Sequence, residues 1–276
     1  HMNRRMGEFP EALRLAEKSL TLAEKLSALE VVAASCCELS VAIAVSGDFK
    51  KARECANRAL RIALENSYWA TALWGYYRVA DMSAPEECEK RIDCIEKGLA
   101  LAKKVGDLTF QSAFLLFKAN ECANSGKLDK AIVLGEDALS LSRRTGNKFD
   151  LASALLRLGQ FYFISGEWEK SGLHNDEATD VARNINEFQL IAGGHITHGF
   201  LHFGKAEYEE AMVPSDATLT IYHCGVCPGA PGNISHMFEY RLNVIVCLLG
   251  SRFVKKAPNA MGVLLPGTLK LIVPFG

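Results

Sequence analysis

Three histidines and two cysteines in the last third of the chain have side chains that could ligate a metal ion. His195, His198 and His202 are spaced i, i+3 and i+7, which places them on one face of a helix. Cys224 and Cys227 follow as Cys-Gly-Val-Cys in a loop rich in glycine and proline. Imidazole and thiolate are common zinc ligands, but a structural site normally draws on a second pair at motif distance, which is missing. Two interpretations stay open: a zinc-stabilised module, or neutral, hydrogen-bonded histidines beside an irregular loop.

No arrangement typical of an enzyme active site accompanies these residues. The Cys-Gly-Val-Cys segment lacks the preceding strand and following helix of a thioredoxin-like redox motif. The sequence has no Gly-x-Ser-x-Gly nucleophile elbow, and the glycines at 193–199 follow no strand that would make them a phosphate loop. Glutamates do recur at one helix-start position, where a carboxylate stabilises the positive helix end; they are Glu8, Glu87, Glu167 and Glu207. We therefore expect a protein that is not an enzyme and needs no cofactor.

Composition narrows the possible partners. Among 276 residues, 49% are hydrophobic and 23% charged, which is typical of a folded chain. The 31 Lys and Arg against 32 Asp and Glu leave a net charge of −1, without the basic field that nucleic acid requires. No uninterrupted apolar run reaches membrane-spanning length. Nine cysteines, an odd number, with no leader after the His1-Met2 cloning remnant, favour a reducing compartment. We expect a cytoplasmic protein without nucleic acid or membrane partners.

The elements that would position these residues form an internal repeat. Turn segments begin at points separated by 39 or 40 residues: Gly7, Gly47, Glu86, Gly126, Gly166 and Ala206. A small residue recurs twelve positions after each point, as Ser19, Ala59, Gly98, Ala138, Ala178 and Thr218. Mostly small residues also recur seven positions before the point, as Ser40, Val79, Ala119, Gly159 and Gly199. A fixed place for a small residue indicates a fixed place where two helices approach closely.

Each repeat predicts two helices joined by the turn. Segments such as ARECANRALRIALE carry apolar residues near i, i+3, i+4 and i+7 and are rich in strong helix formers. Gly106, Gly146 and the stretch Asn184 to Asn186 mark the links between repeats. Strand signals are absent before residue 220. The prediction is an all-α solenoid of stacked helix-turn-helix units with a right-handed superhelix.

The same residues carry a family resemblance. The run Leu158-Gly159-Gln160-Phe161-Tyr162, then Gly166-Glu167-Trp168 and Ala178, resembles the tetratricopeptide repeat. The resemblance covers about residues 7–222, with a repeat longer than the usual 34 residues. Long repeats of this kind resemble the sensor arms of large signalling ATPases and transcription activators. The resemblance implies a protein-binding or effector-binding arm.

Four segments follow from the repeat phase. Residues 1–2 are the cloning remnant, and residues 3–222 form the array of about six units, the first of which is truncated. Residues 223–256 comprise an irregular loop and one further helix, and residues 257–276 an apolar tail rich in proline and glycine. Because the first unit lacks its first helix, the leucines of its second helix should be partly uncovered. We therefore expect self-association as one possible partnership.

The third unit departs from the pattern. Arg91 stands where other units have a small residue, and Trp69, Trp74, Tyr76 and Tyr77 crowd its first helix. These aromatic residues either fill an irregular interface or form a binding platform.

The inner face of the array is the candidate binding site. Its predicted lining is mostly apolar, with two amides that suit backbone groups; the residues are Tyr76, Leu116, Asn120, Leu156, Gln160, Phe163, Ile196, Phe200 and Phe203. Such a groove is typical of a scaffold or regulatory module that binds a peptide or helix of another protein. Two alternatives are a sensing arm that encloses a small apolar effector and the zinc-stabilised interaction module. A tightly wound superhelix that packs these residues against itself also remains open.

Overall fold

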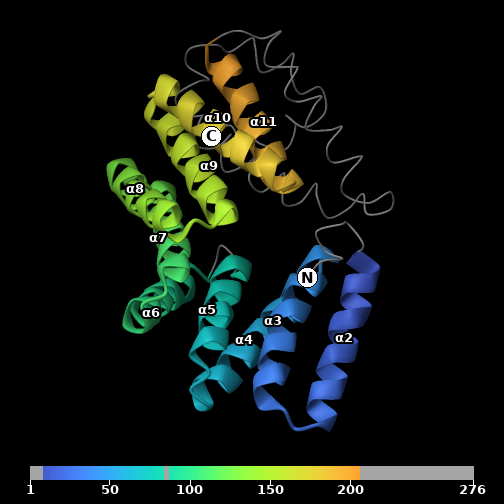
Figure 1. The fold of residues 1–276 in the computed structure, drawn as a ribbon. Coiled ribbons are helices and arrows are strands. Elements are labelled where there is room, and N and C mark those ends of the chain that lie inside the picture. Colours follow the sequence, from blue (N-terminus) through green and yellow to red (C-terminus); the bar gives the residue numbers. More distant parts are fainter. Residues whose placement is uncertain (1–8, 84–86, 206–276) are drawn as a thin grey trace, which may run out of the picture. The chain divides into compact units, whose positions relative to one another are not determined.

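The computed structural model describes residues 9–83 and 87–205, in which every regular element is an α-helix (Figure 1). The helices are α2 (Phe9–Lys25), α3 (Leu29–Val45), α4 (Phe49–Glu65), α5 (Trp69–Met82), α6 (Cys88–Val105), α7 (Leu108–Asn124), α8 (Leu128–Thr145), α9 (Lys148–Ser165), α10 (Trp168–Asn184) and α11 (Phe188–Gly204). Over these described ranges the all-α prediction is confirmed. The Cys-Gly-Val-Cys loop, the further helix and the apolar tail lie outside the described residues.

The helices pack in chain order as predicted hairpins. Within units, α3 packs on α4, α7 on α8 and α9 on α10, across turns that follow the predicted points Gly47, Gly126 and Gly166. Neighbouring units join through α2 and α3, α4 and α5, α6 and α7, α8 and α9, and α10 and α11. The first helices of the units (α3, α5, α7, α9 and α11) also contact one another in succession. This arrangement confirms the solenoid prediction and the repeat phase at Gly47, Gly126 and Gly166, whereas Gly7, Glu86 and Ala206 lie outside the described residues.

Helix ends follow the signals in the sequence. Side chains cap three helix starts: Asp48 accepts from the backbone N–H of Lys51, Asp107 from that of Phe110, and Asn147 from those of Phe149 and Asp150. Gly106 and Gly146 end α6 and α8 with φ of +75° and +70°, a left-handed conformation that favours glycine. Gly106 with Asp107 and Gly146 with Asn147 thus mark two links between successive units, whereas Asp48 starts the second helix within a unit.

The small residues mark close contacts between helices, as predicted. Ala138 is fully buried, and a Cβ on Gly159 would lie 3.2 Å from the backbone oxygen of Ser171 in α10. On α6, a Cβ on Gly98 would overlap the ring of Phe114, which is itself fully buried in α7. The glycines therefore set the spacing within one hairpin and between two units.

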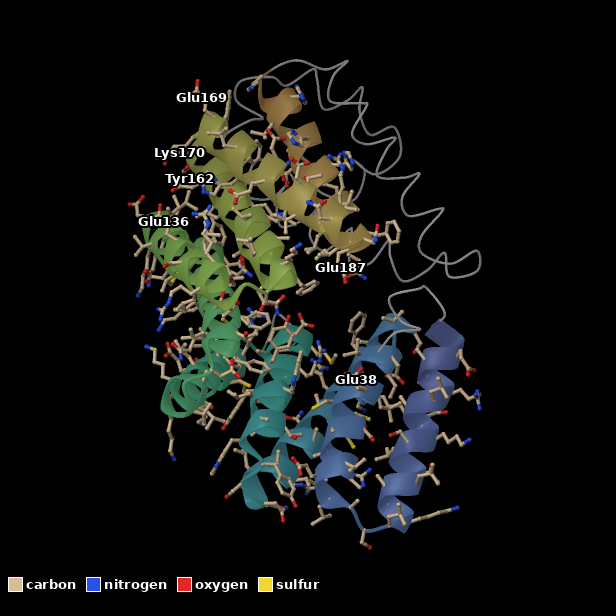
Figure 2. All side chains as sticks on the ribbon, viewed as in Figure 1. Glu38, Glu136, Tyr162, Glu169, Lys170 and Glu187 are labelled. Carbon is tan, nitrogen blue, oxygen red and sulfur yellow. The ribbon has the colours of Figure 1, made fainter. Side chains whose placement is uncertain are left out.

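A polar junction ties three successive helices together beside the main core of the fourth and fifth units. The Tyr162 hydroxyl donates to Glu136 Oε1 at 2.7 Å, and Lys170 Nζ lies 5.1 Å from the Tyr162 ring centroid. Figure 2 shows these three residues close together on α8, α9 and α10. Burial, followed by the hydrogen bond to Glu136, raises the pKa of Tyr162 to about 12, so the phenol stays a donor at neutral pH.

The irregular third unit is held by different contacts. Arg91 pairs with Glu121 of α7 at 2.9 Å, with both side chains 15% exposed. Trp74 and Phe110 meet edge to face at 5.0 Å between ring centroids, and Tyr77 lies 5.1 Å from Phe117. Aromatic residues thus fill the contact between α5 and α7, in agreement with the packing interpretation.

Candidate functional site

The row of first helices carries the side chains predicted to line a groove. Of the nine, Leu156 and Phe163 are buried, and the described side chains of the others are half-buried: Tyr76, Leu116, Asn120, Gln160, Ile196 and Phe200. The side chain of Phe203 lies outside the described residues. The structure therefore brings these positions together along one row, most of them retaining some exposure.

Contacts between first helices explain the two buried members. A Cβ on Gly193 of α11 would lie 2.8 Å from a methyl carbon of Leu156, so the absence of a side chain there lets α11 cover Leu156. The rings of Phe163 and Phe200 lie 6.2 Å apart between centroids. Gln160 is engaged locally, since its Oε1 accepts from Arg157 Nη1 at 3.1 Å. The predicted positions thus lie where one first helix meets the next.

A charged and aromatic constellation on α5 was missed by the sequence reasoning. The guanidinium of Arg78 lies over two rings, 5.0 Å from the centroid of Trp74 and 5.1 Å from that of Tyr77. Arg78 is only 8% exposed, whereas Trp74 is 44% exposed. One signal was available: Arg78 holds the repeat position at which Leu39 and Leu158 are buried in other units.

Charges from two first helices act on the Tyr77 hydroxyl. Burial is the main cause that raises the pKa of Tyr77 to about 12. The carboxylates of Asp81 on α5 and Asp150 on α9 add to the rise, while Arg78 and Arg157 oppose it. Charged side chains therefore act on Tyr77, next to the predicted lining residue Tyr76, whereas the sequence predicted a mostly apolar lining with almost no charge.

Asp150 is a second unusual member of this region. Its Oδ2 is buried and has no hydrogen-bond partner among the described residues. Burial raises the pKa of Asp150 to about 6, with a further contribution from the charge of Asp107. Asp107, which accepts from the Phe110 N–H at the start of α7, is itself a carboxylate and offers no donor to Asp150.

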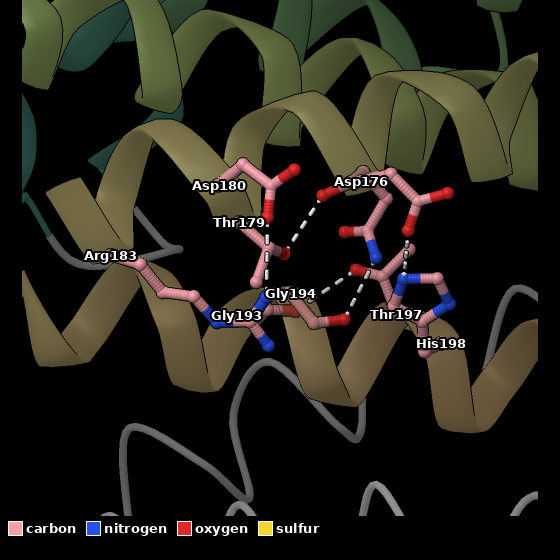
Figure 3. A network of polar contacts seen from close by, with 9 residues as sticks. Asp176, Thr179, Asp180, Arg183, Gly193, Gly194, Thr197 and His198 are labelled. Atoms are coloured by element: carbon pink, nitrogen blue, oxygen red, sulfur yellow. Dashed lines mark hydrogen bonds and ion pairs between the residues drawn. The ribbon is translucent and has the colours of Figure 1, made fainter.

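The three histidines of α11 are half-buried, and Figure 3 shows one of them, His198, beside Asp176 of α10. His198 Nε2 lies 2.8 Å from Asp176 Oδ1 of α10, and its ring stacks 6.4 Å from that of His202. Burial is the main cause that lowers the pKa of His195, which favours its neutral form. Among the described residues, no group of three His, Cys, Asp or Glu side chains could hold a metal ion. Cys224 and Cys227 lie outside those residues, so the zinc hypothesis stays a prediction.

A polar network joins α10 to α11 beside the histidines. Asn175 is fully buried, and its Nδ2 donates to the backbone oxygen of Gly194 at 3.0 Å (Figure 3). Thr197 bonds back to Gly193, and Thr179 to the backbone of Asn175. A Cβ on Gly194 would overlap the Thr179 hydroxyl, so the close approach of α10 and α11 at this point requires glycine at position 194. Asn175 holds the repeat position at which Ala56 and Gly135 lie in other units. Over residues 9–83 and 87–205, none of the helices is long and apolar enough to cross a membrane.

Comparison with solved structures places this arrangement among known repeat proteins. BtubC (BKLC) from P. vanneervenii is 18% identical, with a TM-score of 0.60 over 80% of this chain and 94% of that one. A putative kinesin light chain with TPR-like repeats from Podosopora anserina is 14% identical, with a TM-score of 0.51 over 68% of this chain and 93% of that one. No protein-family model and no curated protein matches the chain.

A third similar structure has a regulatory context. It is a Signal Transduction ATPase with Numerous Domains (STAND) protein with a tetratricopeptide repeat sensor, from Pyrococcus horikoshii. The identity is 17% and the TM-score 0.55, over 88% of this chain and 41% of that one. At these identities the likeness concerns the fold. Together with the helix order, it shows that the chain is an all-α solenoid of tetratricopeptide-like repeats.

Proposed function

We propose that this chain is a protein-interaction module that binds a peptide or helix of another protein along its row of first helices. The observation that carries the proposal is the succession α3, α5, α7, α9 and α11, in which each first helix contacts the next. Such a row offers one extended face to an extended or helical segment. The half-buried amides Asn120 and Gln160 are the groups on it that suit peptide N–H and C=O groups.

The contact between Phe163 and Phe200 favours this function over an enclosed effector site. At 6.2 Å between centroids the rings pack on each other and leave no space for a small apolar molecule between them. In the Pyrococcus horikoshii protein the tetratricopeptide repeats are a sensor, and the same module fits such a role, because a bound segment would serve as the signal to a larger protein.

Selection from a random twelve-residue peptide display library on the immobilised chain tests the proposal. We expect enriched peptides whose affinity falls about 5- to 150-fold when Asn120 and Gln160 are both changed to alanine, since each lost hydrogen bond costs about 0.5–1.5 kcal/mol. Asn57→Ala is the matched control, because Asn57 is an exposed amide on α4, a second helix.

Two results would contradict the proposal. One is a selection that enriches no peptide. The other is a set of peptides whose binding depends on Asn57 and ignores Asn120 and Gln160, which would move the site to the second helices. Circular dichroism of each variant checks that its helical fold is intact.

A further inference from the structure

Two dibasic pairs occupy the same repeat position in successive units. Lys103 and Lys104 lie in the last turn of α6, and Arg143 and Arg144 lie in the last turn of α8. All four side chains are exposed. The helix dipole favours a cation at a C-terminal end, but it does not account for two adjacent cations in both units. The pairs therefore form a surface feature that the fold itself does not explain.

Carboxylates neutralise little of this charge. Over residues 9–83 and 87–205, Lys103, Lys104 and Arg144 form no ion pair. Arg143 meets Glu177 at 3.2 Å in a pair whose side chains are both exposed. An exposed pair of this kind contributes little free energy, because solvent competes with it. The dibasic pairs therefore remain accessible to an external anion.

The links that follow α6 and α8 lie near each other and increase the surplus of positive charge. The charge of Asp107 in the first link acts on Asp150 just after the second, which requires the two links to be close. Asp107 accepts from the N–H of Phe110, and Oδ2 of Asp150 is buried. Lys148, by contrast, is exposed. Residues 102–111 and 142–151 thus carry five exposed cations and no exposed carboxylate, which the net charge of −1 for the whole chain conceals.

Large apolar side chains lie among these cations. Val105 and Phe149 are 43% and 38% exposed, one in each of the two segments. Trp69 at the start of α5 is 41% exposed, and Lys104 Nζ lies 5.3 Å from its ring centroid. The hydrocarbon stems of lysine and arginine can lie along apolar surface while their charged ends stay in water. Exposed aromatic and aliphatic side chains mixed with cations are typical of surfaces that contact lipid headgroups.

We propose that this surface, the basic edge, docks on a membrane with anionic headgroups. The basic edge consists of the exposed side chains of residues 103–105 and 143–149 together with Trp69. Its cations would bind the headgroups, and its apolar side chains would enter the boundary between headgroups and acyl chains. An acidic polypeptide is the rival partner. It would neutralise the cations but would not provide the acyl region that removes Val105 and Phe149 from water.

Sedimentation with vesicles tests the proposal on the full chain. Vesicles of phosphatidylserine and phosphatidylcholine in equal amounts should bind the protein, and vesicles of phosphatidylcholine alone should not. Lys103→Gln with Lys104→Gln should weaken binding at least about fivefold, and so should Arg143→Gln with Arg144→Gln, since each cation near an anionic membrane contributes about fivefold. Phe149→Ser should weaken it at least about threefold, because less apolar area leaves water.

Matched controls change similar residues away from the basic edge. Lys50→Gln with Lys51→Gln removes an exposed dibasic pair at the start of α4. Leu173→Ser removes a 70% exposed leucine of α10. Both control proteins should bind the anionic vesicles like the wild type. Circular dichroism and the melting temperature of each variant check that its fold is intact.

Three outcomes would overturn the inference. The first is a wild type that does not sediment with the anionic vesicles. The second is an equal loss of binding for the control pair at Lys50 and Lys51, which would mean that only total charge matters. The third uses polyglutamate as a probe: binding of polyglutamate through the dibasic pairs without binding of vesicles would identify an acidic polypeptide as the partner. Each of these outcomes would leave the proposed binding of peptides along the first helices standing.

Discussion

Single residues decide how closely two helices of this array approach, and two glycines in one hairpin show opposite cases. A Cβ on Gly159 of α9 would meet the backbone of Ser171 at 3.2 Å, and backbone cannot move aside cheaply. Gly172 on the facing helix α10 has nothing within 4 Å of a built Cβ. Glycine therefore lies at a close helix contact at position 159 and beside open space at position 172.

This difference predicts that substitutions at the two glycines change the free energy of unfolding in opposite directions. Gly159→Leu should destabilise the chain by about 1–3 kcal/mol through overpacking of α9 on α10. Gly172→Ala should stabilise it by up to about 1 kcal/mol, since alanine is the better helix former. Urea unfolding followed by far-ultraviolet circular dichroism measures both. An unchanged midpoint for Gly159→Leu would mean that the assigned contact is wrong.

Asp150 predicts a stability that depends on pH. Its folded-state pKa of about 6 lies above the value of about 4 for an unfolded aspartate, so the folded chain holds the proton more tightly. Stability should therefore fall as pH rises from about 4 to about 6. Asp150→Asn removes this titration, and it should raise the melting temperature more at pH 7.5 than at pH 4.

The matched control for that titration is Asp129→Asn. Asp129 also lies in the first turn of its helix, α8, but is exposed. Its substitution should change the melting temperature little at pH 7.5, because its side chain is exposed to solvent. If Asp150→Asn instead destabilises the chain at pH 7.5, its carboxylate is paired in the folded protein.

At the scale of the element, ion pairs join helices of successive units in two environments. Arg91 of α6 and Glu121 of α7 are both 15% exposed, at 2.9 Å. Arg143 of α8 and Glu177 of α10 form an exposed pair at 3.2 Å, with side chains 56% and 46% exposed. Partial burial strengthens the first pair, whereas solvent screens the second.

Glu121→Gln should accordingly cost about 1–3 kcal/mol of unfolding free energy, because Arg91 loses a charged acceptor in a half-closed interface. Glu177→Gln should cost at most about 1 kcal/mol. Thermal melts at low and high salt separate the two, since added salt should reduce the effect of Glu177→Gln further. Equal costs would mean that the α6–α7 joint does not depend on this pair.

The sequence predicted the turns and the close contacts because these depend on a one-dimensional repeat. Gly159 and Ala138 have mostly small residues at the equivalent positions of the other units, so the position assigned in one unit can be checked against the others. The repeat pattern could not predict the burial of Leu156, because that burial depends on how closely α11 approaches α9 at Gly193. It also could not predict the environment of Asp150, which combines groups from three units. Periodicity fixes the position on a helix, and tertiary contact decides which side chains remain without partners.

At the scale of the whole molecule, one face of α2 carries leucines that no described helix covers. Leu13 and Leu20 pack against the core around α3, whereas Leu15, Leu22 and Leu26 are exposed. In the fifth unit, His174 holds the repeat position of Leu15 and contacts Tyr162 of its own first helix. Burial of each exposed leucine in a partner would contribute about 1.5–3 kcal/mol.

This face predicts self-association that Leu22→Glu should weaken, because a charge would be buried in the contact. Light scattering over a range of concentrations should give a mass that rises above 30.2 kDa for the wild type and stays near it for the variant. Leu173→Glu is the control, at a single exposed leucine of α10. A wild type that remains at the monomer mass at all concentrations would contradict the prediction.

Each helix packs on helices that are close to it in the chain. This packing also governs how the protein folds and how it responds to a pulling force. Extensive contacts link each helix to the next one or to the one after it. The loops that must close during folding are therefore short, and chains dominated by such contacts fold on the microsecond to millisecond scale. Stability accumulates unit by unit along the array. A pulling force applied to its ends would therefore detach hairpins singly, and each would rejoin its neighbour when the tension falls, as in an extensible spring.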